Sequence, residues 1–169
     1  KDGGTHIGSI YNDSTNLAIY SKVNNADMKF IGVDGGSDVT ALTLDMSEAG
    51  AAAFNNSVKA KTYQETYAAK SAASTVTCDL ATAQHFSVTV SANTTFAFTN
   101  PASSGTSYSF ILIVTQHSTA VTLTWPGSVD WAGGAAPAVA GNNEVQAYGF
   151  VTRDGGTTYY GFLGGTAIA

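Results

Sequence analysis

The stretch EVQAYGFVTRDGGTTYYGFLG, Glu144–Gly164, decides the fold class. Two runs rich in aromatic and β-branched residues, 144–153 and 157–164, flank an Asp-Gly-Gly tripeptide that begins at Asp154. Aspartate followed by glycine favours a tight turn, because glycine adopts a positive φ without strain. The sequence therefore predicts a β-hairpin at this position.

Several runs upstream alternate apolar and polar residues with the period of a β-strand. FSVTVSA (86–92), TFAFT (95–99) and VTLTW (121–125) each direct their large apolar side chains to one face. YSFILIVTQ (108–116) contains five consecutive apolar residues, so we expect a central strand covered on both sides. Turn-forming segments such as NPASSG separate these runs, and no helical pattern lies between them. Residues 62–169 are thus expected to form an antiparallel β-sandwich or jelly-roll-like head.

Two segments are also compatible with a helix. SEAGAAAF (47–54) begins with a possible Ser47 cap, but Gly50 and the short length favour a turn. TYQETYAAKSAAS (62–74) is rich in alanine, yet its alternation also permits a strand, which we favour.

The first 61 residues have short apolar runs, each with few large side chains. Strands of this kind cannot bury a self-sufficient core in a monomer. Three chains wound about a common axis could bury one together and would also cover the exposed strand edges. The expected fold is all-β, with an intertwined trimeric β-stem (1–61) followed by the sandwich head (62–169).

Charge is distributed unevenly along the chain. The net charge is −5, and the fifty residues 80–129 contain no Asp, Glu, Lys or Arg. Phosphate binding needs clustered Lys and Arg, so we expect no nucleic-acid partner. The longest strongly apolar run, 110–114, is too short for membrane insertion. Cys78 is the single cysteine and is expected to be a small buried residue.

Two longer stretches resemble the tail-fibre proteins of tailed bacteriophages. DGGSDVTALTLDMSEAGAAAFNNSV (34–58) resembles the repeated shaft element of such fibres. FTNPASSGTSYSFILIVTQHSTAVTLTWPGSVDWAGGAAP (98–137), followed by FVTRDGGTTYYGF (150–162), resembles their C-terminal head. With the residues between them, the resemblance covers most of the chain. Its most specific part is Trp-Pro-x-x-Val-x-Trp-Ala-Gly-Gly with the downstream Asp-Gly-Gly hairpin.

The resemblance implies a homotrimer in the virion, with an elongated intertwined stem and a distal head. It also implies that the head adheres to a bacterial surface glycan or protein receptor, as an extracellular structural and receptor-binding tip. Family heads often have Lys or Arg before the second tryptophan, whereas this chain has Asp130. A ligand contact at that position would therefore differ in its charge preference. An alternative function is that of a carbohydrate-binding β-sandwich module in a secreted protein.

The candidate ligand-binding residues are Trp131, Asp130, Tyr148 and Tyr159. Aromatic faces stack on sugar rings, and carboxylates fix sugar hydroxyls. Trp131 lies in a glycine-rich loop and could instead close the end of the sandwich. Trp125 is in phase with the apolar face of its strand and is expected in the core. Neighbouring strand residues point to opposite faces, so at least one of Tyr159 and Tyr160 should lie away from the core.

Catalysis and metal binding have weaker support, and we expect no enzyme activity, cofactor or metal site. A glycan hydrolase would need two carboxylates beside a groove, and Asp130 with Glu144 is the candidate pair. The three histidines are expected at surfaces or edges, and no Gly-x-Ser-x-Gly motif is present. The segment 34–38 could supply Ca²⁺ ligands but is expected to be a plain turn. His6 is the stem histidine that could bind an axial ion in a trimer.

Overall fold

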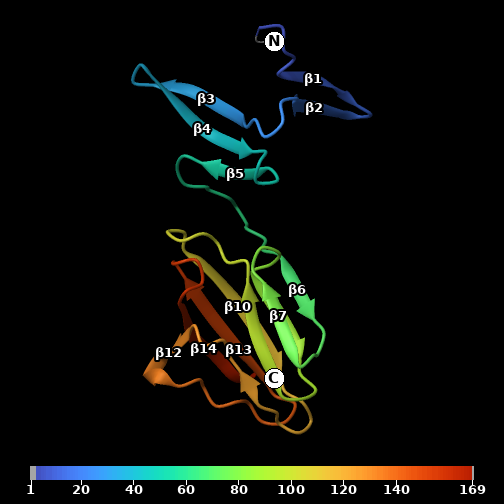
Figure 1. Ribbon diagram of the computed structural model, residues 1–169, viewed down its shortest axis with the longest axis vertical. Coiled ribbons are helices and arrows are strands. Elements are labelled where there is room, and N and C mark those ends of the chain that lie inside the picture. The colour runs from blue at the N-terminus through green and yellow to red at the C-terminus, as the bar shows by residue number, and fades with distance from the viewer. Residues whose placement is uncertain (1–2, 169) are drawn as a thin grey trace. The chain divides into compact units, whose positions relative to one another are not determined.

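The computed structural model describes residues 3–168 and contains two compact units, which are treated separately. Unit 1 is Lys1–Thr62 and unit 2 is Tyr63–Ala169 (Figure 1). Their boundary lies one residue beyond the one expected from the sequence. The described residues are almost entirely strands and turns, with one short 3₁₀ helix at Ala132–Gly134. The expected all-β, sandwich-like fold class is therefore confirmed.

Unit 1 consists of two small antiparallel sheets. Strands β1 (Gly8–Asp13) and β2 (Asn16–Ser21) form a hairpin. Strands β3 (Met28–Asp34), β4 (Ser37–Asp45) and β5 (Ala51–Phe54) form a three-stranded sheet in that order. Gly35 and Gly36 connect β3 to β4 with φ values of 58° and 84°, a two-residue hairpin turn that glycine accommodates. The expected turn near 47–50 is also present, with Asp45 Oδ1 accepting the backbone N–H groups of Ser47 and Glu48.

Unit 1 has no core of its own. No residue between 3 and 62 is buried. Its large apolar side chains are exposed: Ile7, Ile10, Tyr11, Leu17, Ile19, Tyr20, Val23, Phe30, Ile31, Val33, Phe54 and Val58. The sequence-based expectation that these strands lack a self-sufficient core therefore agrees with the structure.

Unit 2 contains two sheets. The larger sheet has the order β12-β14-β13-β10-β8-β6, and the smaller sheet has the order β11-β9-β7. The strands are β6 (Tyr67–Lys70), β7 (Thr75–Asp79), β8 (His85–Thr89), β9 (Thr94–Thr99), β10 (Tyr108–Thr115), β11 (Leu123–Thr124), β12 (Val129–Trp131), β13 (Val145–Thr152) and β14 (Tyr159–Ile168). The segment for which we favoured a strand over a helix contributes only β6.

The strand directions in unit 2 differ from the expected antiparallel arrangement. From β6 to β11 the chain enters the two sheets alternately. Each crossing reverses its direction, so neighbours within one sheet run parallel: β6 with β8, β8 with β10, β7 with β9 and β9 with β11. Antiparallel pairing is found where β13 joins β10 and β14, and β12 pairs parallel with β14. The sandwich is therefore mixed rather than antiparallel.

The core of unit 2 lies between its two sheets. Phe98 from the smaller sheet packs on Phe110 and Phe150 from the larger sheet, with ring centroids 4.9 Å apart in both pairs. Phe110 and Phe150 stack on each other at 4.9 Å. The remaining buried apolar residues are Val76, Cys78, Leu80, Ala83, Phe86, Val88, Val90, Phe96, Leu112, Val114, Leu123, Tyr148 and Tyr159. Cys78 is buried as expected, and burial raises the pKa of its thiol to about 12.

Strand β10 is covered on one side only. Phe110, Leu112 and Val114 face the core, whereas Ile111 and Ile113 are each 39 % exposed. As expected, β10 is a central strand of its sheet and lies between β8 and β13. In the single chain, however, the expected cover on its second face is missing.

The predicted hairpin between β13 and β14 is confirmed, with Val151 opposite Tyr160. Asp154 organises its connection, because its Oδ1 accepts the Thr158 N–H and the Thr152 hydroxyl, both at 3.0 Å. These hydrogen bonds hold the pKa of Asp154 below its ordinary value of 3.8. The stabilisation is complete above that value and is lost as pH falls through the folded-state pKa.

We expect Asp154→Asn to lower the melting temperature of unit 2 at pH 7 and to have a smaller effect at pH 3. The physical reason is that Asp154 of the unfolded chain takes up its proton near pH 3.8 while the folded carboxylate keeps a lower pKa, so the stabilisation is already reduced once the pH is below 3.8. Circular dichroism melts across this range measure the effect. Asp130→Asn, at an exposed position of the same unit, is the matched control, and equal pH dependence in both variants would contradict the assignment.

Candidate functional site

Trp125 follows β11 and packs against the core, as its strand phase predicts. Its ring stacks on Phe96 with centroids 4.8 Å apart and an interplanar angle of 19°. Tyr148 lies 4.6 Å from it on the larger sheet. Trp125 thus contacts both sheets, through Phe96 of the smaller sheet and Tyr148 of the larger sheet.

Trp131 ends β12, the edge strand of the larger sheet. Its ring packs edge to face on Trp125 at 5.2 Å and 67° and lies over Gly161 of β14. A Cβ atom at Gly161 would lie 2.7 Å from the Trp131 ring. Glycine at this position therefore lets Trp131 lie flat against the sheet.

Trp131 also borders an open hollow of about 300 Å³. The lining residues are Trp131, Ala132, Ala135, Pro137, Gly161, Phe162 and Leu163. Trp131 is half-buried, so it closes the end of the sandwich with part of its surface and faces the hollow with the rest. Both roles considered for this residue from the sequence are compatible with that position.

Polar groups of β12 and β14 lie near the Trp131 end of the sheet but outside the lining of the hollow. Asp130 is exposed and pairs in register with Tyr160, which is 39 % exposed. The Arg153 guanidinium lies 5.9 Å from the centre of the Tyr160 ring, a cation–π distance. Asp130 and Tyr160 occupy the strand positions that alternate with Trp131 and Gly161, so they face the other side of the sheet edge.

Buried glutamines position the loops around this end of the sandwich. Gln146, in β13, accepts the Ala140 N–H at 2.7 Å and donates to the Ala138 carbonyl at 2.8 Å. The Tyr148 hydroxyl donates to the same Gln146 Oε1 at 2.6 Å. Gln116 makes an equivalent pair of bonds to the backbone of Val121. Each glutamine side chain hydrogen-bonds the backbone of a loop, and the loop held by Gln146 carries Ala135 and Pro137, which line the Trp131 hollow.

Two of the four expected binding residues are corrected by the structure. Tyr148 and Tyr159 are 1 % and 2 % exposed, because both lie in phase with the inward-facing residues of their strands. Burial raises the pKa of Tyr148 to about 12. Neither tyrosine has a surface to offer to a ligand. Tyr160, left out of the expected set, is the exposed member of its pair, as the alternation within TTYYGF allowed.

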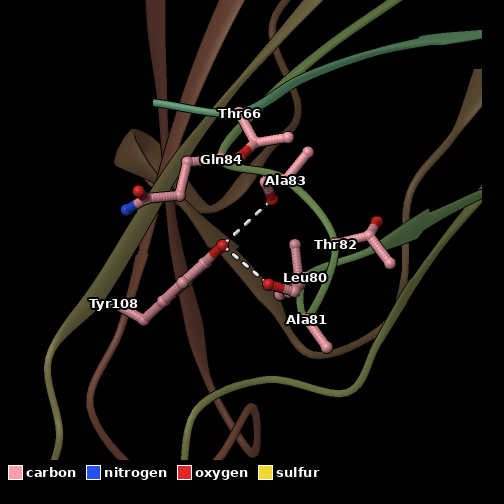
Figure 2. Close-up of a pocket in the computed structure, with 7 residues that line it drawn as sticks. All are labelled: Thr66, Leu80, Ala81, Thr82, Ala83, Gln84 and Tyr108. Atoms are coloured by element: carbon pink, nitrogen blue, oxygen red, sulfur yellow. Dashed lines mark hydrogen bonds between the residues drawn. The ribbon is translucent and has the colours of Figure 1, made fainter. Parts of the chain in front are cut away.

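A second hollow, of about 260 Å³, lies under the loop between β7 and β8. It is lined by Thr66, Leu80, Ala81, Thr82, Ala83, Gln84 and Tyr108 (Figure 2). The Tyr108 hydroxyl points to the loop and is placed to donate to the carbonyls of Leu80 and Ala83, at 2.8 and 3.0 Å. These hydrogen bonds attach the loop between β7 and β8 to β10, and the hollow results from this attachment.

The acidic residues weighed for catalysis have local structural partners. Glu144 Oε2 accepts the Gly141 N–H at 2.8 Å, and Asp79 Oδ1 accepts the Ala81 N–H at 3.1 Å. Asp154 holds its own turn. Asp130, the other member of the candidate pair, lies exposed on β12 outside the lining of the hollow.

The histidines have local contacts as well. His85 Nε2 pairs with Glu65 Oε2 on the larger sheet. His117 Nδ1 lies 3.3 Å from the Thr119 N–H within its own turn. His6 is exposed in unit 1. Within residues 3–168, no group of three or more His, Cys, Asp or Glu side chains is placed to hold a metal ion.

The chain was compared with protein families, curated proteins and solved structures, and none of the three matches it. Over the described part of the chain, no helix has the length and apolarity needed to cross a membrane.

We expect Gly161→Ala to displace the Trp131 ring and to destabilise unit 2 by about 1–3 kcal/mol, because the added methyl overlaps the indole. Tryptophan fluorescence and urea unfolding report the two effects. Gly127→Ala is the matched control, since a Cβ there meets nothing within 4 Å. Unchanged fluorescence in Gly161→Ala would show that Trp131 does not pack on β14.

Proposed function

We propose that this protein is the structural and receptor-binding tip of a bacteriophage tail fibre, a homotrimer that adheres to the bacterial cell surface. Unit 1 carries the proposal, because it has ordered strands without a single buried side chain among residues 3–62. The tail-fibre resemblance of 34–58 and 98–137 supplies the biological setting, on the outside of a virion.

The trimer follows from the balance of free energies in unit 1. Each large apolar side chain stabilises a fold by about 1.5–3 kcal/mol when it is buried. Unit 1 leaves all of its large apolar side chains at least partly exposed to water, and its sheets have two and three strands with open edges. Small sheets of this kind are marginal alone. Copies of the chain that cover these faces and edges would supply the missing burial.

Sedimentation and light scattering of the wild-type chain test the trimer, and a stable monomer would contradict it. We expect Leu17→Lys to raise the concentration at which the trimer dissociates at least tenfold, because a charge enters the proposed interface. Asn16→Lys, the adjacent residue on the opposite face of β2, is the control. If both variants assemble like the wild type, Leu17 lies outside the contact.

Adhesion is assigned to the hollow beside Trp131. The Trp131 ring and the apolar walls of the hollow offer a surface for stacking on a sugar ring, and Asp130 and Tyr160, on the adjoining strand positions outside the hollow, offer groups that recognise hydroxyls. A bacterial surface glycan is the ligand class this chemistry favours. Asp130 would favour neutral or cationic sugars over acidic ones at this position.

The absence of a core in the described part of unit 1 speaks against the alternative of a monomeric carbohydrate-binding module. A first unit with a core of its own would have favoured the monomeric carbohydrate-binding module. The engagement of Glu144, Asp79 and Asp154 in local turns leaves the hydrolase alternative without a structural argument. Adhesion without catalysis is the proposal retained.

We expect Trp131→Ala to weaken binding to host cells at least tenfold, because the stacking surface in the hollow is removed. Binding of fluorescently labelled trimer to whole cells and to a glycan array measures it. Tyr63→Ala, which removes an exposed aromatic ring outside the sheets, is the control. Full binding by a folded Trp131→Ala trimer would remove the hollow from the receptor site.

A further inference from the structure

The outer face of the larger sheet in unit 2 is apolar and uncovered. Its central residues are related by register: Ile111 pairs with Gly149 of β13, and Gly149 pairs with Phe162 of β14. Ile111 also pairs with His85 of β8. Paired residues share a face, so Phe162, Gly149, Ile111 and His85 form one row across the sheet.

In this row Gly149 leaves an open space between the exposed side chains of Ile111 and Phe162. A Cβ added at Gly149 would meet nothing within 4 Å. Ile111 and Phe162, on either side, are 39 % and 53 % exposed. The space above Gly149 is a hollow of about 310 Å³, lined by apolar Ile111, Val151 and Phe162 and by polar Glu65, Gln84, His85 and Ser109. One surface therefore carries both apolar projections and a recess of side-chain size with a mixed lining.

We infer that this face, centred on the Gly149 hollow, is covered by the same face of a second copy of the chain. Phe162 or Ile111 of one copy enters the Gly149 hollow of the next, in a cyclic arrangement. The inference rests on the proposed trimer and adds a contact made by unit 2 to those proposed for unit 1.

Charge favours a second copy over a partner of another kind. Strands β8 and β10 lie within the fifty-residue span that has no Asp, Glu, Lys or Arg. His85, on the rim, is paired with Glu65 of the same chain. Around Ile111 and Ile113 two copies can therefore meet without bringing like charges together, whereas the charged groups that another partner would bind, Asp130 and Arg153, lie away from this centre beside Tyr160.

The size of the face fits this role. Six strands spaced about 4.8 Å apart, three to ten residues long with a mean of about six, give a face of roughly 600 Å² at about 3.3 Å per residue. A standard protein interface takes about 800 Å² from each partner. A contact of this size is adequate when unit 1 adds its own burial in the same assembly.

Gly149→Val tests the contact without a clash inside the subunit. The added side chain enters open space, and valine suits a strand better than glycine, so a single subunit keeps its fold. In the assembly the same side chain occupies the recess that the neighbouring copy needs. Gly127→Val, at the other glycine of unit 2 that has open space and no positive φ, is the matched control.

The readout is the labelling rate by maleimide of a thiol introduced on this face in the full-length protein. Ile113→Cys places the probe beside the hollow, and Ser118→Cys, at an exposed turn position, gives the reference rate. The native Cys78 is fully buried and does not compete. We expect the Ile113→Cys thiol to react at least tenfold more slowly than the reference. Adding Gly149→Val should remove that protection, whereas adding Gly127→Val should not.

Labelling of Ile113→Cys within threefold of the reference in a sedimenting trimer overturns this inference and leaves the proposed trimer standing. Protection that Gly149→Val does not change also overturns it. A monomeric wild-type chain overturns both this inference and the proposed homotrimer. If such a monomer gains protection only when host-cell surface glycan is added, the face belongs to the receptor and not to a second copy.

Discussion

The alternate entry of successive strands into two sheets is the constraint on which unit 2 depends. From β6 to β11, each connection carries the chain across the core. Residues from both sheets must then point inward, and the rings of Phe98, Phe110 and Phe150 meet in the space between them. The parallel pairings are a consequence of this winding, because two reversals restore the original direction.

The sequence predicts which side chains of a strand face the core. It does not predict which strands lie next to each other in a sheet. Period-two alternation correctly placed Phe86, Val88 and Val90 in the core, and the Asp-Gly-Gly turn located the β13–β14 hairpin. Pairings such as Ile111 with His85 join residues far apart in the chain. Nothing in the local pattern of either strand encodes such a pairing, so the expected antiparallel directions were wrong for the pairs among β6 to β11 and right for β10 with β13 and β13 with β14.

The candidate site was predicted only in part, for a related reason. Trp131 lines the hollow and Asp130 is exposed at the adjacent strand position, whereas Tyr148 is one of the inward-facing residues of β13, as Phe150 is. Gln146 has the same phase and was missed, because a polar residue at an inward position was not considered as a buried anchor. Such a residue is stable in the core only when loop backbone groups satisfy both ends of its amide, as Ala138 and Ala140 do here.

The charge-free span 80–129 affects how contacts made by its residues would respond to salt. Dissolved ions screen attractions between exposed charges over about 8–10 Å at physiological ionic strength. Contacts built from hydroxyl, amide and apolar groups lack that long-range component and are insensitive to such screening. Contacts made by the uncharged residues of this span would therefore depend less on salt concentration than contacts made by Asp130 or Arg153, which lie outside it.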